Sequence, residues 1–277
     1  MRLTPRNFLW LLRRSVIAAF DDGALSTAKG AAYSALLSFF PVLATAATIL
    51  VETREDFVAR SLQNVLEQIV PPGSEDLVMQ QFTLGSHPHP LLVGAVLLSI
   101  WAASGVIKSL IEGFQAAYRV PRSRSFFQNN VVALSLVLLS LVPLLAASVL
   151  ILFGAQAEIW VLKVDPRLSA TWDLLSRVAR LLLAFLTMIA VTTSLYYFGP
   201  NRRQRWRWVW PGAVVATVLW MLATSGFAWY TRRIANYNVM YGSIGAGIAL
   251  LVWMYVMAVI ALIGCEFNAE LERARPS

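Results

Sequence analysis

The sequence predicts an all-α, polytopic membrane protein with six transmembrane helices and short amphipathic helices at the membrane surface. Hydrophobic residues make up 58% of the 277 residues and charged residues only 14%, and the mean hydropathy is +0.62. This balance is far more apolar than that of a soluble domain. A scan for stretches without charge gives six spans of bilayer-crossing length, at roughly 30–51, 90–110, 131–155, 178–199, 209–230 and 243–265.

The net charge of +8 is distributed unevenly over the connections between these spans. Lysine and arginine are concentrated before the first span, in the second and fourth connections and in the tail. The first connection, 52–89, carries six acidic residues against two arginines. Because an even number of spans places both termini on one side, and basic segments stay on the cytoplasmic side, both termini are predicted to be cytoplasmic.

Three segments follow from this topology: a cytoplasmic interfacial helix in 1–29, a single membrane domain in 30–265 and a cytoplasmic tail in 266–277. Phe8, Leu12, Val16 and Phe20 recur every four residues, which predicts a helix over 5–20 lying in the membrane surface. The connection 52–89 contains a similar apolar repeat before a Pro-Pro-Gly stop and predicts two short amphipathic helices outside the membrane. These helices either rest on the bundle or the outer leaflet, or they form a small lid.

Four arginines alternate with three tryptophans in FGPNRRQRWRWVWPG, residues 198–212. Taken alone, the mixture fits RNA, because arginine pairs with phosphate and tryptophan stacks on bases. The apolar spans on both sides instead predict a short cytoplasmic loop whose tryptophans lie at the level of the headgroups. Anionic membrane lipids are therefore the predicted partner, rather than nucleic acid. The candidate headgroup residues are Arg202, Arg203, Arg205, Arg207, Trp206 and Trp208.

Residues that usually build catalytic or metal sites are scarce. His87 and His89 are the only histidines and are flanked by prolines, which favours a turn over a metal site, and Cys265 is the only cysteine. The chain has no phosphate-cradling glycine loop and no serine nucleophile elbow. We therefore predict no catalytic residue, no metal, no cofactor and no enzyme activity. The absence of an acid near the middle of any span also disfavours a proton-driven pump.

Polar residues and a helix breaker mark a candidate path in the first two spans. Tyr33, Ser34 and Ser38 give the first span a polar face, and Pro41 interrupts it, either as a hinge or cavity wall or as a plain bend. Lys108 and Glu112 lie one helical turn apart at the inner end of the second span. The spacing favours a simple ion pair, with a cavity-lining pair as the alternative.

The sixth span supplies the remaining path candidates. Tyr241 and Gly242 begin YGSIGAG, whose glycines favour close helix packing first and a flexible gate second. At the other end of the span, Glu266 is either a solvated residue just past the membrane or faces the bundle beside Asn268.

Five motifs resemble the YihY/BrkB family of bacterial inner-membrane proteins, over a region from about Asp21 to Leu271. They are KGAAYSALLSFFPVL at 29–43, GFQAAYRV at 113–120, YYFGP at 196–200, WPGAVVATVLW at 210–220 and YGSIGAGIALLVWMYVMAVIALIGCEFNAEL at 241–271. The first and last motifs are the most specific. The family pattern falls on Ala31, Ala32, Tyr33, Ser38, Pro41, Gly113, Tyr118, Pro200, Gly212, Ala213, Tyr241, Gly242, Ser243, Gly264, Glu266 and Asn268.

The resemblance implies a multi-pass protein of the bacterial inner membrane with six helices and cytoplasmic ends. Family members have been labelled ribonuclease BN, but a nuclease needs clustered metal ligands or an acid/base pair on the cytoplasmic side, and none is predicted there. Other members are associated with serum resistance and with envelope-lipid movement. We therefore expect a transporter or flippase-like handler of anionic lipids or amphiphiles. The alternative is a non-transporting scaffold or envelope-assembly factor, and a homo-oligomer or an envelope protein partner stays open.

Overall fold

The computed structural model describes residues 5–52, 89–120, 124–164, 169–233 and 242–274, and these residues form helices with no strand among them. Six helices are long: α2 (Ala24–Glu52), α5 (His89–Ala117), α6 (Phe126–Val164), α7 (Ser169–Phe198), α8 (Trp210–Arg233) and α10 (Gly242–Arg273). A shorter helix, α1 (Pro5–Asp21), precedes them, and the 3₁₀ turn η2 (Trp206–Trp208) lies between α7 and α8.

The long helices coincide with the predicted spans, and the all-α polytopic fold is confirmed. Five of them, α5, α6, α7, α8 and α10, contain segments of 22 to 27 residues that are long and apolar enough to cross a membrane. The helix α2 continues through Pro41, and α6 continues through Pro143. Outward faces carry large apolar side chains such as Trp101, Leu145 and Leu222, as expected for helices in contact with lipid.

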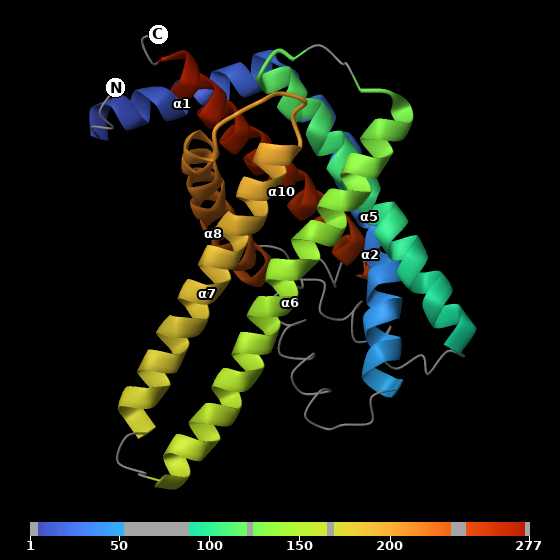
Figure 1. Cartoon of the computed structure of the whole chain (residues 1–277), viewed down its shortest axis with the longest axis vertical. Helices are drawn as coiled ribbons and strands as arrows, with labels where there is room; N and C mark the ends of the chain where they lie inside the picture. Colours follow the sequence, from blue (N-terminus) through green and yellow to red (C-terminus); the bar gives the residue numbers. More distant parts are fainter. Residues whose placement is uncertain (1–4, 53–88, 121–123, 165–168, 234–241, 275–277) are drawn as a thin grey trace.

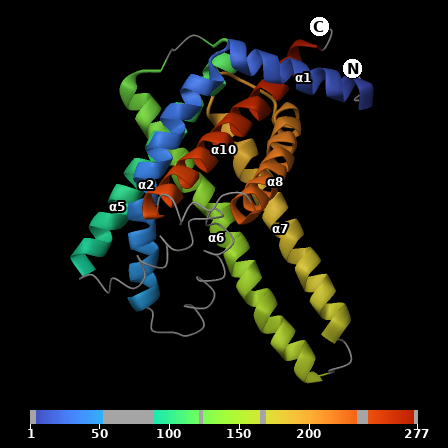
Figure 2. The same cartoon turned by 180° about the vertical axis from the view of Figure 1, so that it is seen from behind.

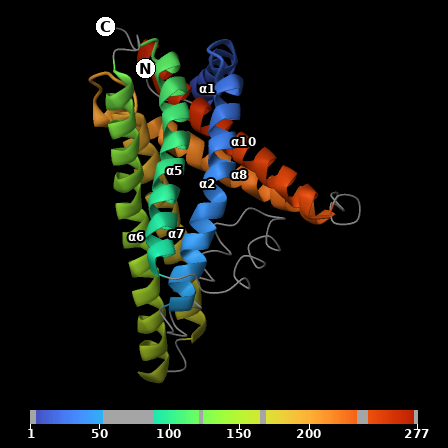
Figure 3. The same ribbon diagram turned by 90° about the vertical axis from the view of Figure 1, so that its right-hand side faces the viewer.

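The helices form a layer that is crossed by a tilted pair. In Figure 3, α2, α5, α6 and α7 run close to the long axis of the molecule, whereas α8 and α10 lean away from it. Along the layer, α2 packs on α5, α5 on α6, and α6 on α7. The helix α10 contacts α1, α2, α5 and α8, and Figure 2 shows it crossing the back of the molecule between α2 and α8.

One end of the bundle, uppermost in Figure 1, gathers both termini and the connections that follow α5 and α7. We call it the basic end and define it as α1 with residues 118–120, 124–125, 199–209 and 266–274. These are the segments in which the sequence concentrates arginine. Their common location is what an even number of crossings produces.

The helix predicted over 5–20 is confirmed as α1, which lies across the basic end (Figure 1). Leu11 packs into a buried cluster with Val215, Phe267 and Leu271. The buried side of α1, which contains Leu11, is therefore offset by one residue from the predicted apolar stripe, which contains Leu12. The reason is that α10 packs on that side of the helix. On the other side α1 exposes apolar residues, among them Leu9, which suits a helix lying in a membrane surface.

The densest packing surrounds the C-terminal part of α10. A Cβ atom added to Gly212 of α8 would lie 2.1 Å from the backbone oxygen of Gly264, so the two helices meet backbone to backbone. From α7, the hydroxyl group of Tyr196 donates to the carbonyl oxygen of Ala261 at 2.5 Å. Small residues thus allow α7, α8 and α10 to approach closely, as in other helix pairs in membranes.

The structure leaves several predicted features untested. The two predicted outer helices in 52–89, apart from the residues at its two ends, and His87 and Tyr241 lie outside the described residues. Gly242 is described only as the first residue of α10.

Candidate functional site

Two acidic side chains of α10 point into the interior of the basic end. Those of Glu266 and Glu270 are only 3% and 4% exposed. Glu270 forms ion pairs of 2.5 Å with Arg14 of α1 and with Arg273. Arg273 also lies 3.9 Å from Glu266 and donates to the carbonyl oxygen of Ala117. We call Glu266, Glu270, Arg14 and Arg273 the acid cluster. Of the two alternatives for Glu266, the structure has the one that faces the bundle.

Asn268 joins α10 to the first turn of α8. Its Oδ1 accepts a hydrogen bond from the backbone N–H of Gly212 at 2.7 Å, and its Nδ2 donates to the carbonyl oxygen of Val209 at 2.6 Å. The first N–H groups of a helix have no partner within the helix, so Asn268 caps α8 from a neighbouring helix. The side chain is 1% exposed, and its hydrogen bonds are used within the fold.

Residues 199–209, which we call the basic loop, connect α7 to α8 and are fixed to the end of α7. Gln204 Nε2 donates to the carbonyl oxygens of Tyr196 and Tyr197 at 2.6 and 3.2 Å. The ring of Trp206 packs against Tyr197 with 5.1 Å between centroids. These contacts give the loop a defined shape.

Three of the four loop arginines, Arg203, Arg205 and Arg207, are exposed. Arg205 lies over the ring of Trp208 at 5.6 Å from its centroid, and Trp206 is 47% exposed. These predicted headgroup residues are therefore accessible from outside the bundle.

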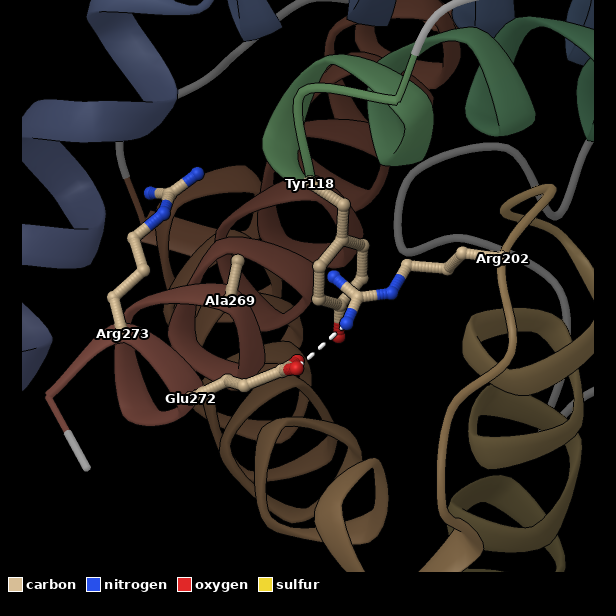
Figure 4. Close-up of a pocket in the computed structure, with 5 residues that line it drawn as sticks. All are labelled: Tyr118, Arg202, Ala269, Glu272 and Arg273. Atoms are coloured by element: carbon tan, nitrogen blue, oxygen red, sulfur yellow. Dashed lines mark hydrogen bonds and ion pairs between the residues drawn. The ribbon is translucent and has the colours of Figure 1, made fainter. Parts of the chain in front are cut away.

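The fourth arginine, Arg202, faces inward. Its Nη2 pairs with Glu272 Oε1 at 2.6 Å, and its guanidinium group lies 4.5 Å from the centroid of the Tyr118 ring. Figure 4 shows Arg202 between these two partners, with Arg273 directed away from them. Arg202, Glu272 and Tyr118 line a cavity of about 230 Å³ together with Ala269 and Arg273. Burial raises the pKa of the Tyr118 hydroxyl group.

A second cavity, of about 550 Å³, lies between the start of α6 and the basic loop. Three arginines line it: Arg202 and Arg203 from the loop, and Arg124 from the connection before α6. Arg124 Nη1 donates to the carbonyl oxygen of Gly199 at 2.8 Å. Sequence reasoning missed Arg124, because the two residues in this contact are 75 positions apart. The only available signal was its place in a basic connection.

The predicted path residues of α2 lie on different sides of that helix. Ser38 is buried and donates to the carbonyl oxygen of Ala35 at 2.9 Å. Ser34 lies against α5, where a Cβ atom added to Gly105 would be 3.3 Å from its Oγ. Tyr33 is 62% exposed. The structure thus places Ser34 in the α2–α5 contact, while Tyr33 points outward from the bundle.

Lys108 and Glu112, the predicted pair in α5, also differ in their surroundings. Lys108 Nζ donates to Asn130 Oδ1 of α6 at 2.9 Å, so its partner is on the neighbouring helix. Glu112 is exposed.

A bundle of apolar helices with a charged end defines the class of this molecule: it is a polytopic helical membrane protein. The sequence profile of the family described as virulence factor BrkB matches residues 18–277. The chain belongs to this family.

Named relatives agree with this assignment. YfkH of Bacillus subtilis, named a ribonuclease-like protein, is 31% identical over 253 residues, covering 88% of each chain. A UPF0761 membrane protein of Vibrio vulnificus is 29% identical over 276 residues, covering 95% of this chain and 84% of its own. One of Vibrio campbellii is 28% identical over 274 residues, covering 95% and 81%. No solved structure matches the chain.

Proposed function

We propose that this protein is a transporter or flippase-like handler of anionic lipids or similar amphiphiles in the bacterial inner membrane. One observation carries the proposal: the basic loop presents Arg203, Arg205 and Arg207 beside exposed Trp206 and Trp210, at one end of a membrane-crossing bundle. Tryptophan is enriched at the headgroup level. Each juxtamembrane arginine adds about 1 kcal/mol of attraction to an anionic leaflet. The loop is therefore suited to gather anionic headgroups.

The orientation belongs to the same proposal. The basic end carries both termini, and the positive-inside rule supports a cytoplasmic location for it. In this arrangement the basic loop faces the inner leaflet, and the proposed route toward the outer leaflet follows α2 past Tyr33 and Pro41. The acyl chains remain in the surrounding lipid.

The proposed function is not enzymatic. The name of the Bacillus subtilis relative raises ribonuclease activity. That chemistry needs clustered metal ligands or an acid/base pair at the RNA. The buried carboxylate of Glu270 is instead engaged by Arg14 and Arg273. Purified protein with divalent metal should leave RNA intact, and metal-dependent cleavage would restore the nuclease as a candidate.

The test is lipid translocation by purified protein in anionic liposomes. A variant with Arg202, Arg203, Arg205 and Arg207 all changed to glutamine should move anionic lipid at least about tenfold more slowly. The four arginines together contribute about 4 kcal/mol of attraction, which exceeds the 1.4 kcal/mol of a tenfold effect. The control changes two arginines elsewhere to glutamine, Arg232 and Arg233, which end α8 at its other terminus. An equal loss in the control would mean that total charge, and not the loop, matters.

Failure of the assay favours a different class of function. If folded wild-type protein moves no lipid class above protein-free liposomes, a scaffold or envelope-assembly role becomes the better account. The next step is then a search for a stable protein partner.

A further inference from the structure

The second cavity has an unusual charge balance. It is lined by Arg124, Arg202 and Arg203 with Asn201, Gln204 and Tyr197, and none of the described residues that line it is acidic. Its volume of about 550 Å³ lies within the usual range of small-ligand sites, about 300–1,000 Å³. A cavity with three guanidinium groups and no acid is a natural place for an anion.

Arg124 is held in place by two backbone carbonyl groups. Its Nη1 and Nη2 donate to the carbonyl oxygens of Gly199 and Phe198, at 2.8 and 3.4 Å. Burial lowers the pKa of Arg124, and within the described residues no ion pair offsets this loss of hydration. A guanidinium group has five N–H donors, so donors remain after these two bonds. These donors are available to an anion that enters the cavity.

The other two arginines differ in availability. Arg202 is engaged by Glu272 and stacks on Tyr118. Arg203 is exposed at the edge of the cavity. Arg124 and Arg203 therefore supply the charge that is open to a ligand, one from a fixed position and one from a movable side chain.

From this geometry we infer that the second cavity binds a phosphate group, with Arg124 and Arg203 as its main ligands. Phosphate offers several oxygens in a tetrahedral arrangement, and guanidinium groups bind such oxygens in pairs. The source is either the headgroup of an anionic lipid or a free phosphate ion. The assignment of a lipid headgroup as the source rests on the proposed function, whereas the phosphate site is inferred independently of that function.

The experiment measures binding to the full-length protein in a neutral detergent by calorimetry. The probes are inorganic phosphate, a short-chain phosphatidic acid and a short-chain phosphatidylcholine as the zwitterionic control. Arg124→Gln and Arg203→Gln should each weaken binding of phosphatidic acid about tenfold, the effect of one hydrogen bond to a charged group. Arg13→Gln, which removes an exposed arginine from α1, should leave binding unchanged.

The outcomes separate the sources. Competition between inorganic phosphate and phosphatidic acid supports a phosphate site that a headgroup occupies. Saturable binding of inorganic phosphate alone supports the site with a soluble anion as its ligand. The inference is overturned if neither probe binds saturably to wild type, or if Arg124→Gln and Arg203→Gln both bind as wild type does. Because Arg203 is exposed, its variant keeps the test valid if Arg124→Gln does not fold.

Lipid translocation by the same variants distinguishes this inference from the proposed function. If lipid moves normally in variants that bind no differently from wild type, the site is wrong and the function stands. If phosphate binding depends on Arg124 but no lipid moves, the site stands and transport is wrong.

Discussion

The acid cluster and the basic loop lie at the same end of the molecule and use charge in opposite ways. In the acid cluster, the carboxylate of Glu270 is buried and pairs with Arg14 and Arg273, so charge joins α1 to α10. In the basic loop, Arg203 and Arg205 are exposed. The comparison teaches that paired charge holds the helices together here, whereas the outward charge is available to a partner. Changes near the cluster should therefore affect folding, and changes near the loop should affect binding.

The largest expected effect is on the packing beside the acid cluster. Gly212→Val would place side-chain atoms where even a Cβ atom lies 2.1 Å from the Gly264 oxygen. Overpacking usually costs about 1–3 kcal/mol and more against rigid backbone, so we expect loss of folded protein in detergent. Size-exclusion chromatography and thermal unfolding measure this. Gly247→Val is the control, because nothing lies within 4 Å of a Cβ atom added there. Equal folded yields for the two variants would contradict the packing argument.

A smaller loss is expected from Asn268→Ala. It leaves the N–H of Gly212 and the carbonyl of Val209 without the partner they have in the structure. Each orphaned buried group costs about 1–3 kcal/mol, so the midpoint of thermal unfolding should fall. Ser194→Ala is the control, because that hydroxyl group bonds only within its own helix, to Ala190. An unchanged midpoint for Asn268→Ala would show that water replaces the cap.

The smallest effect is expected beside the basic loop, and it is a gain in phosphate binding. Glu272→Gln removes the partner of Arg202 and frees this arginine for the second cavity. Pairs near the surface contribute about 0.2–1 kcal/mol, so stability should change little while phosphate binding strengthens by about 1.4- to fivefold. Calorimetry with inorganic phosphate measures the change, and Glu112→Gln removes an exposed carboxylate as the control. Weaker binding in Glu272→Gln would mean that this pair shapes the site rather than competing with it.

The sequence predicted the helices well because each span is determined by its own stretch of residues and not by distant partners. Apolar stretches bounded by charge located the spans, and the even number of spans agrees with the common end that carries both termini. The partners of individual side chains were harder to predict from the sequence. The sequence left Glu266 with two alternatives, because only the positions of α1 and α5 around α10 decide whether the end of that helix is buried.

The polar face of the first span shows the same limit. Periodicity groups Tyr33 and Ser34, which are adjacent in sequence, but it does not say which neighbour covers which side of the helix. In the fold Ser34 meets α5 and Tyr33 points outward. Arg124 and the basic loop likewise meet only through the antiparallel packing of α6 and α7. Their role in binding stays a prediction.

The length of α6 has a consequence for how the molecule is approached. Its 39 residues extend for about 58 Å at 1.5 Å per residue, nearly twice the hydrocarbon thickness of about 30 Å. Its N-terminal end belongs to the basic end, so the excess emerges on the opposite face (Figure 1). There, α6 and α7 extend beyond the other described helices as a two-helix post (Figure 1). We therefore expect a soluble protein or antibody that arrives from that side to meet this post first.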